Sequence, residues 1–191
     1  MEKTRVGFAL CGSFCTLASV ISQIKKFVGM GFDVLPIMSE ITYNTDSRFG
    51  SAKSFIDKIE EITGKKIINS VKQAEVIGPK KLLDILVIAP CTGNTAAKIA
   101  LGVSDTSVTM ACKSHLRNQR PVLISLASND ALGNGAKNIA HLLNMKNVYL
   151  VPFEQDDCIN KPNSLISNVE LIYESAIEAM GGRQIQPVLY K

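Results

Sequence analysis

Residues 85–95 read Ile-Leu-Val-Ile-Ala-Pro-Cys-Thr-Gly-Asn-Thr, and they point to the architecture more directly than any other stretch. The first five are apolar without alternation, which is typical of a strand that is buried on both faces of a parallel sheet. Pro90 ends the apolar run, and small polar residues lead into a helical pattern over residues 95–101. A buried strand followed by a short polar loop and a helix predicts a βαβ arrangement.

The same alternation extends in both directions along the chain. Further strands are expected over residues 4–11, 32–38, 121–126 and 148–151, and further helices over 17–28, 51–62, 79–83, 106–116, 134–145 and 164–180. Residues 42–50 and 154–162 are polar and are expected to form loops. The pattern predicts a single α/β domain over residues 1–191, Rossmann-like and doubly wound, with a mostly parallel sheet and helices on both faces. Residues 183–191 form a tail with no evident place in the core.

Composition excludes several classes of protein. The 191 residues are 46% hydrophobic, which excludes intrinsic disorder and allows a large core. No apolar run approaches the ~20 residues of a membrane span, and the net charge of +4 is scattered, so neither a membrane nor a nucleic acid is an expected partner. Five cysteines without a CxxC pair or an export leader predict reduced thiols in the cytoplasm, and with only two histidines we expect no metal site.

Small polar residues follow four of the expected strands. In a doubly wound sheet, ligands bind beyond the carboxyl ends of the strands. The residues at these ends are Gly12 and Ser13, then Ser39, then Thr92, Asn94 and Thr95, and finally Ser128 and Asn129. Their hydroxyls and amides, with the N–H groups of helix starts, suit a phosphate or the edge of a heterocycle. Each loop alone is equally consistent with a plain turn or a helix cap, and their combination favours a nucleotide-like site.

The sequence assigns no catalytic residue. No nucleophile and base stand in an evident pair, and His115 and His141 fall in expected helices, where we expect them on the surface. Cys91 precedes a helix start, a position that lowers the pKa of a thiol. A free cysteine next to a core strand is more often an inert packing residue, so we favour packing, or support beneath a cofactor, over nucleophilic catalysis.

Residues 88–120 resemble the flavoprotein superfamily, which includes flavin prenyltransferases, phosphopantothenoylcysteine decarboxylases and lantibiotic cysteine decarboxylases. The similar segments are residues 89–95, which match an Ala-Pro-Ala-Thr-Ala-Asn-Thr motif, and residues 102–105, which match a Gly-x-x-Asp-Asn turn. The resemblance implies that the chain binds FMN, with the phosphate held by hydroxyls and backbone N–H groups of the strand-end loops. It adds Asp105 to the candidate site. It also implies a homo-oligomer, a trimer or a dodecamer, with the flavin between subunits.

Over its whole length the chain resembles one branch of this superfamily most closely, the B subunits of dipicolinate synthases. The segments that carry this resemblance are residues 9–16, 75–79 and 134–164. The branch implies a role in making pyridine-2,6-dicarboxylate (dipicolinate) from dihydrodipicolinate, or from its hydroxytetrahydro precursor, in the mother cell of a sporulating bacterium. The implied partner is the A subunit of the synthase, a dehydrogenase-like chain that binds NAD(P). The tail and residues 154–162 are candidate surfaces for docking that partner.

Two residues that other members of the superfamily use are absent from this sequence, and their absence bears on which function we favour. Residues 39–90 contain no histidine, although the cysteine decarboxylases use one there, and residues 109–111 lack the arginine with which the prenyltransferases hold prenyl phosphate. We therefore favour an oxidoreductase subunit that works together with the dehydrogenase-like partner. The alternatives are an independent FMN-dependent decarboxylase or prenyltransferase, and a non-catalytic assembly subunit with a relic flavin site.

Overall fold

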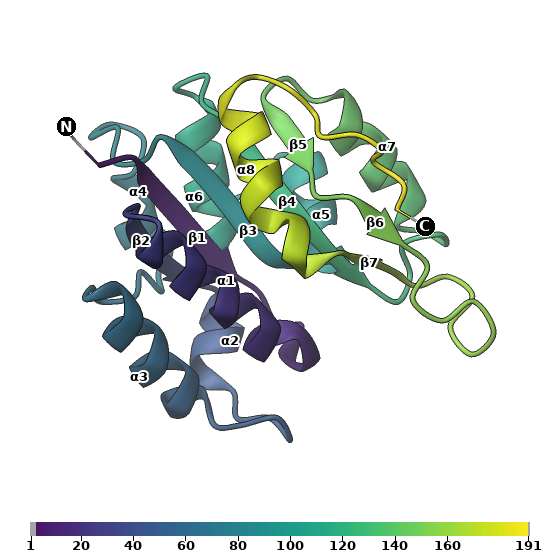
Figure 1. Ribbon diagram of the computed structural model, residues 1–191, viewed down its shortest axis with the longest axis horizontal. Coiled ribbons are helices and arrows are strands. Elements are labelled where there is room, and N and C mark those ends of the chain that lie inside the picture. The colour runs from purple at the N-terminus through teal and green to yellow at the C-terminus, as the bar shows by residue number, and fades with distance from the viewer. Residues whose placement is uncertain (1–2, 191) are drawn as a thin grey trace.

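A computed structural model describes residues 3–190 and contains one seven-stranded sheet (Figure 1). The strand order is β2-β1-β3-β4-β7-β6, and β5 pairs with the first half of β4. The strands are β1 (Arg5–Leu10), β2 (Asp33–Met38), β3 (Ile85–Thr92), β4 (Val122–Ser128), β5 (Val148–Leu150), β6 (Phe153–Glu154) and β7 (Leu165–Ser167). The first five strands pair in parallel, and β7 pairs antiparallel with both β4 and β6. The predicted α/β fold with a mostly parallel sheet is confirmed.

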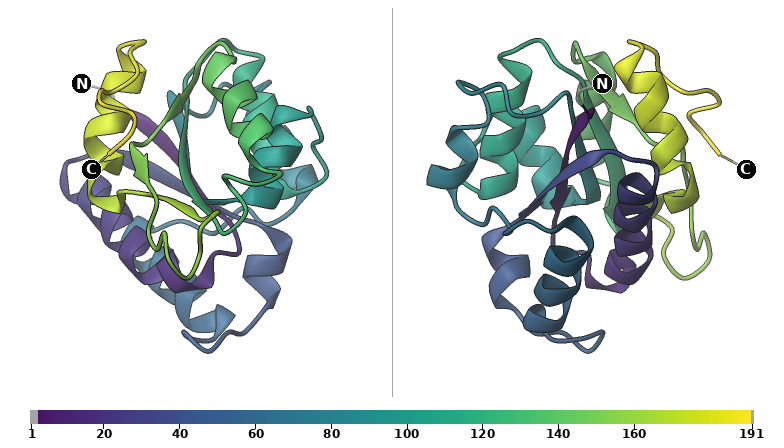
Figure 2. Two further views of the ribbon diagram at one scale, coloured as in Figure 1. Left: turned by 90° about the vertical axis from the view of Figure 1, so that its right-hand side faces the viewer. Right: turned by 60° about the vertical axis from the view of Figure 1, so that its left-hand side comes forward.

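Helices cover both faces of the sheet (Figure 2). The helices are α1 (Leu17–Gly29), α2 (Glu40–Asn44), α3 (Ala52–Thr63), α4 (Val71–Glu75), α5 (Gly93–Ala100), α6 (Ser107–Leu116), α7 (Ala136–Asn144) and α8 (Ile172–Met180), with 3-10 turns η1 (Phe14–Thr16) and η2 (Val169–Leu171). One buried apolar cluster lies under α1, α3 and α8, and the other under α4, α5, α6 and α7. Among residues 3–190, no helix has both the length and the apolar character needed to cross a bilayer.

Strand β3 shows how the central strand serves both clusters. Ile85 and Val87 belong to the cluster under α1, whereas Leu86 and Ile88 belong to the cluster under α5, as the two-residue period of a strand requires. The register against β4 shifts between Ile88 and Cys91, and Cys91 therefore lies on the same face as Ile88. The irregularity is at Pro90, which has no N–H to donate to the ladder.

The structure corrects three of the expected elements. The helix predicted over residues 79–83 is wrong: the helix lies upstream, where Ser70 caps α4 by accepting the N–H of Gln73. The helix predicted over 164–180 is wrong in its first half, because residues 165–167 form β7 and α8 begins only at Ile172. The loop predicted over residues 42–50 is shorter, because its first three residues belong to the short helix α2, which Ser39 caps.

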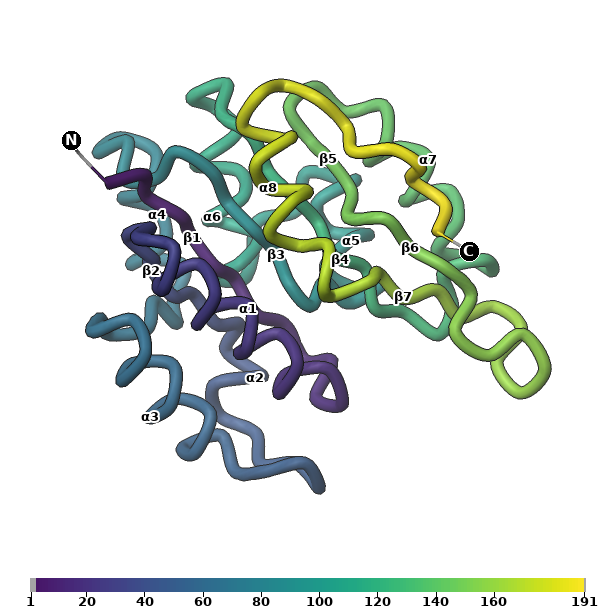
Figure 3. The backbone as a smooth tube through the Cα atoms, in the orientation of Figure 1, coloured from purple at the N-terminus to yellow at the C-terminus, as the bar shows by residue number. Residues whose placement is uncertain are grey.

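The tail has a defined place, contrary to expectation. After α8 it runs along β5 to β6, as the tube in Figure 3 shows, and the side chain of Gln184 bonds to the backbone of Leu150 in β5. The N–H of Phe153 donates to the carbonyl of Val188 at 3.0 Å, and the N–H of Tyr190 donates to the carbonyl of Phe153 at 3.0 Å. Val188 packs partly buried against the core, so the tail extends the sheet edge that β6 would otherwise leave open.

The surface position predicted for His115 is wrong. His115 lies on the inner side of α6 and is only 1% exposed, and its Nε2 is 3.0 Å from the carbonyl oxygen of Pro121, to which it donates. Burial lowers the pKa of the ring from 6.5 to about 4, and the nearby Arg120 charge adds to the decrease. His141, by contrast, is exposed on α7, as predicted.

The buried imidazole predicts a loss of stability in mild acid. Between pH 6.5 and pH 4 the unfolded chain takes up a proton that the folded chain does not, so the free energy of unfolding decreases as the pH decreases through this range. The expected contribution of His115 is a loss of about 2 kcal/mol from pH 7 to pH 5. Urea unfolding at both pH values checks this: His115→Gln should reduce the pH dependence by that amount, and His141→Gln should leave it unchanged. An unchanged pH dependence in His115→Gln would contradict the prediction.

Candidate functional site

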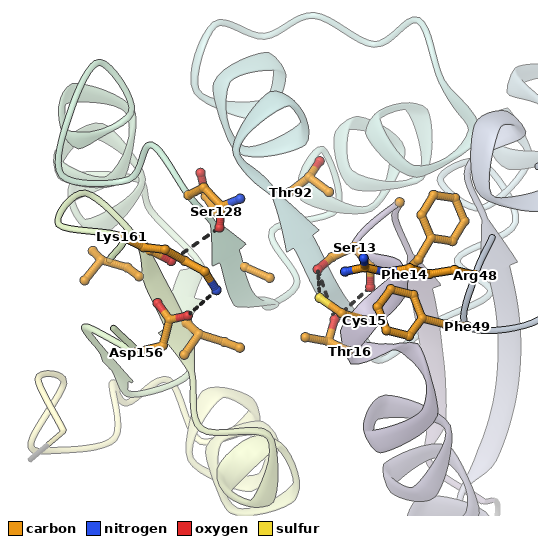
Figure 4. A pocket seen from close by; sticks show the side chains of 16 residues that line it. Ser13, Phe14, Cys15, Thr16, Arg48, Phe49, Thr92, Ser128, Asp156 and Lys161 are labelled. Atoms are coloured by element: carbon orange, nitrogen blue, oxygen red, sulfur yellow. Dashed lines mark hydrogen bonds and ion pairs between the residues drawn. The ribbon is translucent and has the colours of Figure 1, made fainter. Parts of the chain in front are cut away.

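The site lies where the connections of the sheet reverse direction. Strand β1 pairs with β2 on one side and with β3 on the other, so the loops that follow β1 and β3 diverge and leave a crevice between them. A cleft of about 350 Å³ occupies this position at the carboxyl ends of the strands (Figure 4). Of the candidate residues, the cleft is lined by Gly12, Ser13, Thr92, Ser128 and Asn129.

The loop after β1 forms one wall of the cleft. The Thr16 hydroxyl donates to the carbonyl of Ser13 at 2.9 Å and lies 3.2 Å from the Ser13 hydroxyl. This bond closes the turn that precedes α1 and fixes Ser13 at the mouth of the cleft. A Cβ atom at Gly12 would lie 3.7 Å from Phe14 and from Thr42, which is an ordinary contact, so the neighbours leave room for a side chain at this position.

The start of α5 forms the floor. Thr92 caps the helix by accepting the N–H of Thr95 at 3.3 Å, and its own hydroxyl donates to the hydroxyl of Thr95 at 3.1 Å. Thr95 in turn donates to the sulfur of Cys11 at 3.3 Å, which ties α5 to the end of β1. Thr95 is thus buried below the floor. The N–H groups of Gly93 and Asn94 have no acceptor inside the helix because they belong to its first turn.

The loop after β4 forms the opposite wall and separates the cleft from a second hollow. Ser128 accepts the N–H of Asp130 at 3.3 Å, and Asn129 accepts from Ser164 at 3.5 Å. A Cβ atom at Gly93 would lie 2.5 Å from the Ser128 hydroxyl, so a larger residue there would require the Ser128 side chain to move. The adjoining hollow, of about 420 Å³, is lined by Asn94 and shares Thr92, Ser128 and Asn129 with the cleft.

Besides the buried Thr95, two candidate residues line neither the cleft nor the adjoining hollow. Ser39 caps α2 and is buried, with its hydroxyl 2.7 Å from that of Thr42. Asp105 lies in the loop after α5, where both carboxylate oxygens accept from Lys98 at 2.8 and 2.9 Å. The hydrogen bond from Lys98 lowers the pKa of the Asp105 carboxyl. Their assignment to the cofactor site therefore stays a prediction that rests on the resemblance alone.

Four of the lining residues that the sequence analysis missed come from two polar loops. Arg48 and Phe49 come from the loop after α2, and Asp156 and Lys161 come from the loop between β6 and β7. Both segments were identified as polar loops, but no motif marked these residues as part of the site. The one signal in the sequence was that the loop with Arg48 and Phe49 lies beyond the carboxyl end of β2, and ligands bind at this end of the strands.

The buried thiols are inert. Cys91 is fully buried, and burial raises the pKa of its thiol well above 9, with further increases from Cys11 and Cys112. Burial also raises the pKa of Cys11 to about 11, against the hydrogen bonds from Thr95 and Thr92. These thiols are not nucleophiles at neutral pH, which supports the packing interpretation of Cys91. Among residues 3–190, no three His, Cys, Asp or Glu side chains are grouped as metal ligands.

Residues 1–177 match the Flavoprotein family. The chain belongs to the flavoprotein family. It is 41% identical over 189 residues to the B subunit of dipicolinate synthase from Bacillus subtilis (strain 168), a match that covers 99% of this chain and 94% of that protein. It is also 31% identical to a phosphopantothenoylcysteine decarboxylase of Oryza sativa subsp. japonica, over 75% of this chain and 60% of that protein. The resemblance to the B-subunit branch is confirmed.

Solved flavoprotein structures share the fold. The crystal structure of the B subunit of dipicolinate synthase from Bacillus halodurans C has a TM-score of 0.91 at 41% identity and covers 100% of this chain and 99% of that chain. Burkholderia xenovorans DmrB in complex with FMN, described as a cubic protein cage for redox transfer, has a TM-score of 0.70 at 15% identity, over 95% of this chain and 97% of that chain. At that identity, the second likeness supports the fold alone.

The residues of the cleft fit the flavin that the flavoprotein family implies. The first turn of α5, which borders the adjoining hollow, and the hydroxyl of Ser13 supply donors for a phosphate, in the arrangement that helix starts offer to anions. Phe14, Ala127 and Ile166 supply apolar surface for a ring system in the same cleft. Because the two hollows meet at Thr92 and Ser128, they offer a continuous surface to a ligand with a charged end and an aromatic end.

Proposed function

We propose that this chain is the B subunit of a dipicolinate synthase and that it works together with the A subunit, a dehydrogenase-like chain that binds NAD(P). The observation that carries the proposal is the 41% identity to the B subunit of the Bacillus subtilis synthase over nearly the full length of both chains. The proposed product is pyridine-2,6-dicarboxylate, made in the mother cell of a sporulating bacterium. The proposed compartment is therefore the cytoplasm.

The proposed reaction is an aromatisation. Dihydrodipicolinate loses two electrons and two protons to become dipicolinate, which is the loss of one hydride and one proton. If the hydroxytetrahydro precursor is the substrate, it first loses water. NAD(P)⁺ on the dehydrogenase-like partner is the proposed hydride acceptor, and a flavin, when bound, supplies a second group that can take up a hydride.

The proposed cofactor of this chain is FMN, held in the cleft. The hydroxyl of Ser13 and the N–H groups at the start of α5 are proposed to hold the phosphate, with Thr92, which caps that helix, beside it. Asn94 is proposed to meet the ring or ribityl edge from the adjoining hollow. The remaining proposed contacts are Gly12, Ser39, Thr95, Asp105, Ser128 and Asn129, of which Ser39, Thr95 and Asp105 act from outside the cleft lining.

A homo-oligomer is part of the same proposal. Three large apolar side chains on the neighbouring helices α5 and α7 and their flanking residues are exposed: Leu101 by 75%, Val103 by 41% and Leu143 by 44%. Exposed apolar groups on one face favour contact between subunits. Mass photometry of the purified chain distinguishes a trimer or dodecamer from a monomer, and a monomer at micromolar concentration would contradict this part of the proposal.

Reconstitution tests the function. The dehydrogenase-like partner is assayed for dipicolinate formation from freshly prepared precursor, with and without this chain and with and without FMN. We expect product only when this chain is present, and a higher rate with FMN. A requirement for the chain but not for FMN would favour the relic-flavin alternative, in which the chain acts by assembly. Turnover by this chain alone would favour an independent flavin enzyme, and full activity of the partner without this chain would reject the proposed role.

A further inference from the structure

Two cationic side chains face the cleft from opposite sides. Figure 4 shows Arg48 on one side and Lys161 on the other, with Ser13 and Thr92 between them. They come from loops more than a hundred residues apart in sequence, which follow α2 and β6. Asp156 is the one carboxylate among the residues that line this cleft, so the lining carries a net positive charge.

Arg48 is held in place by local structure and not by an acid. Ser47 and Gly50 pair through two backbone hydrogen bonds of 3.0 and 3.1 Å, so Arg48 and Phe49 form the tip of a tight turn. The guanidinium lies over the Phe49 ring, 4.9 Å from its centroid. Within residues 3–190, Arg48 forms no ion pair. Its donors are therefore available to an anion in the cleft.

Lys161 lies in a loop that is stabilised by hydrogen bonds between its own residues. The N–H of Lys161 donates to the carbonyl of Asp157 at 2.8 Å, and the side chain of Gln155 donates to the carbonyl of Pro162 at 2.6 Å. The ammonium is 3.5 Å from an oxygen of Asp156, a long ion pair that leaves donors of the ammonium free. The loop thus holds a second positive charge at the cleft in advance of binding.

We propose that Arg48 and Lys161 bind the two carboxylates of a small planar dicarboxylate, which lies over the flavin site. This inference rests on the proposed function, because it names the residues that would hold its substrate or product. An arginine forms a two-pronged bond with a carboxylate, and a lysine acts as a point charge. Two separate charges on opposite sides of a cleft match a ligand with two separate anionic ends.

A single phosphate is a poorer match for this pair. A phosphate gathers its donors around one centre, and the first turn of α5 with the nearby hydroxyls already provides such a centre. Figure 4 shows Arg48 and Lys161 on two sides of that centre, so the two charges are apart from each other and not gathered at one point. The Asp156 carboxylate beside Lys161 would also repel a dianionic phosphate more strongly than it would repel one end of a dicarboxylate.

Calorimetry with two ligands separates these roles. The full-length chain, with and without added FMN, is titrated with pyridine-2,6-dicarboxylate and with the monocarboxylate pyridine-2-carboxylate, and the FMN affinity is measured separately by fluorescence. The variants are Arg48→Gln, Lys161→Gln and both together. The controls are Arg183→Gln and Lys53→Gln, which remove the same charges from exposed ion pairs outside the cleft.

We expect each cleft variant to weaken dicarboxylate binding by about tenfold and the double variant by about a hundredfold. The monocarboxylate should bind the wild-type chain about tenfold more weakly than the dicarboxylate, and the FMN affinity and both controls should match wild type. A loss of FMN affinity with unchanged dicarboxylate binding would overturn the inference and assign the pair to the phosphate. Wild-type dicarboxylate affinity in the double variant, or none in the wild-type chain, would also overturn it, while the reconstitution assay judges the proposed function independently.

Discussion

Replacing Asn94 by leucine is expected to remove FMN from the purified protein while the fold is retained. Asn94 is exposed in the first turn of α5 and faces the hollow that adjoins the cleft. Leucine there would remove an amide that can both donate and accept, and would cover the free N–H groups of the turn with an apolar side chain. The loss of two ligand hydrogen bonds corresponds to a decrease in FMN affinity of about a hundredfold.

The measurement is a fluorescence titration with FMN, together with thermal unfolding. Asn144→Leu is the matched control, because Asn144 is also an exposed helical asparagine but lies at the end of α7, outside both hollows. Asn94→Gln should restore part of the affinity, because it keeps the amide. An FMN affinity in Asn94→Leu equal to that of wild type would remove Asn94 from the proposed site.

Much of this site could be predicted because it depends on local sequence. The strand over residues 85–89 and the polar residues after it are contiguous in sequence. The apolar run, the loop and the start of the helix could therefore be identified together. The rule that ligands bind at the carboxyl ends of parallel strands then placed three loops at one crevice. Thr92 and Ser128 lie there because each ends its strand, and Ser13 lies there because it follows β1 by three residues.

What was missed depends on contacts distant in sequence. Strand β7 is only three residues long, and it is held in the sheet by antiparallel pairing with β4, a partner distant in sequence. From the sequence alone, its residues could not be distinguished from the start of the helix that follows. His115 was expected on the surface because it is polar, although it follows Ala111 and Cys112 at the spacing of the buried face of α6. The partner that satisfies the buried ring, the carbonyl of Pro121, lies beyond that helix. Arg48 and Lys161 reach the cleft from two irregular loops. No periodicity in the sequence predicts the direction in which such a loop runs.

Replacing Gly78 by alanine is expected to lower the free energy of unfolding by about 2–3 kcal/mol, because no space exists for a methyl group. A Cβ atom there would lie 2.5 Å from the backbone carbonyl oxygen of Ser114 and 3.1 Å from the side chain of Arg117, both on or next to α6. The carbonyl of Gly78 also accepts from the side chain of Asn118 at 2.8 Å, which holds the two segments together. To admit the methyl group, the segment must move away from α6 and weaken this bond.

Thermal unfolding measures the effect, with an expected decrease in Tm of about 5–10 °C for a chain of this size. Gly29→Ala is the matched control: Gly29 ends α1, and a Cβ atom there would have nothing within 4 Å. Alanine is the better helix former, so this control should be neutral or more stable by about 0.5 kcal/mol. Because Gly78 is not among the residues that line the cleft or the adjoining hollow, FMN affinity should be unchanged in Gly78→Ala at temperatures where it is folded. A Tm equal to that of wild type would show that the segment moves away from α6 without cost, and that the close packing at Gly78 does not contribute to stability.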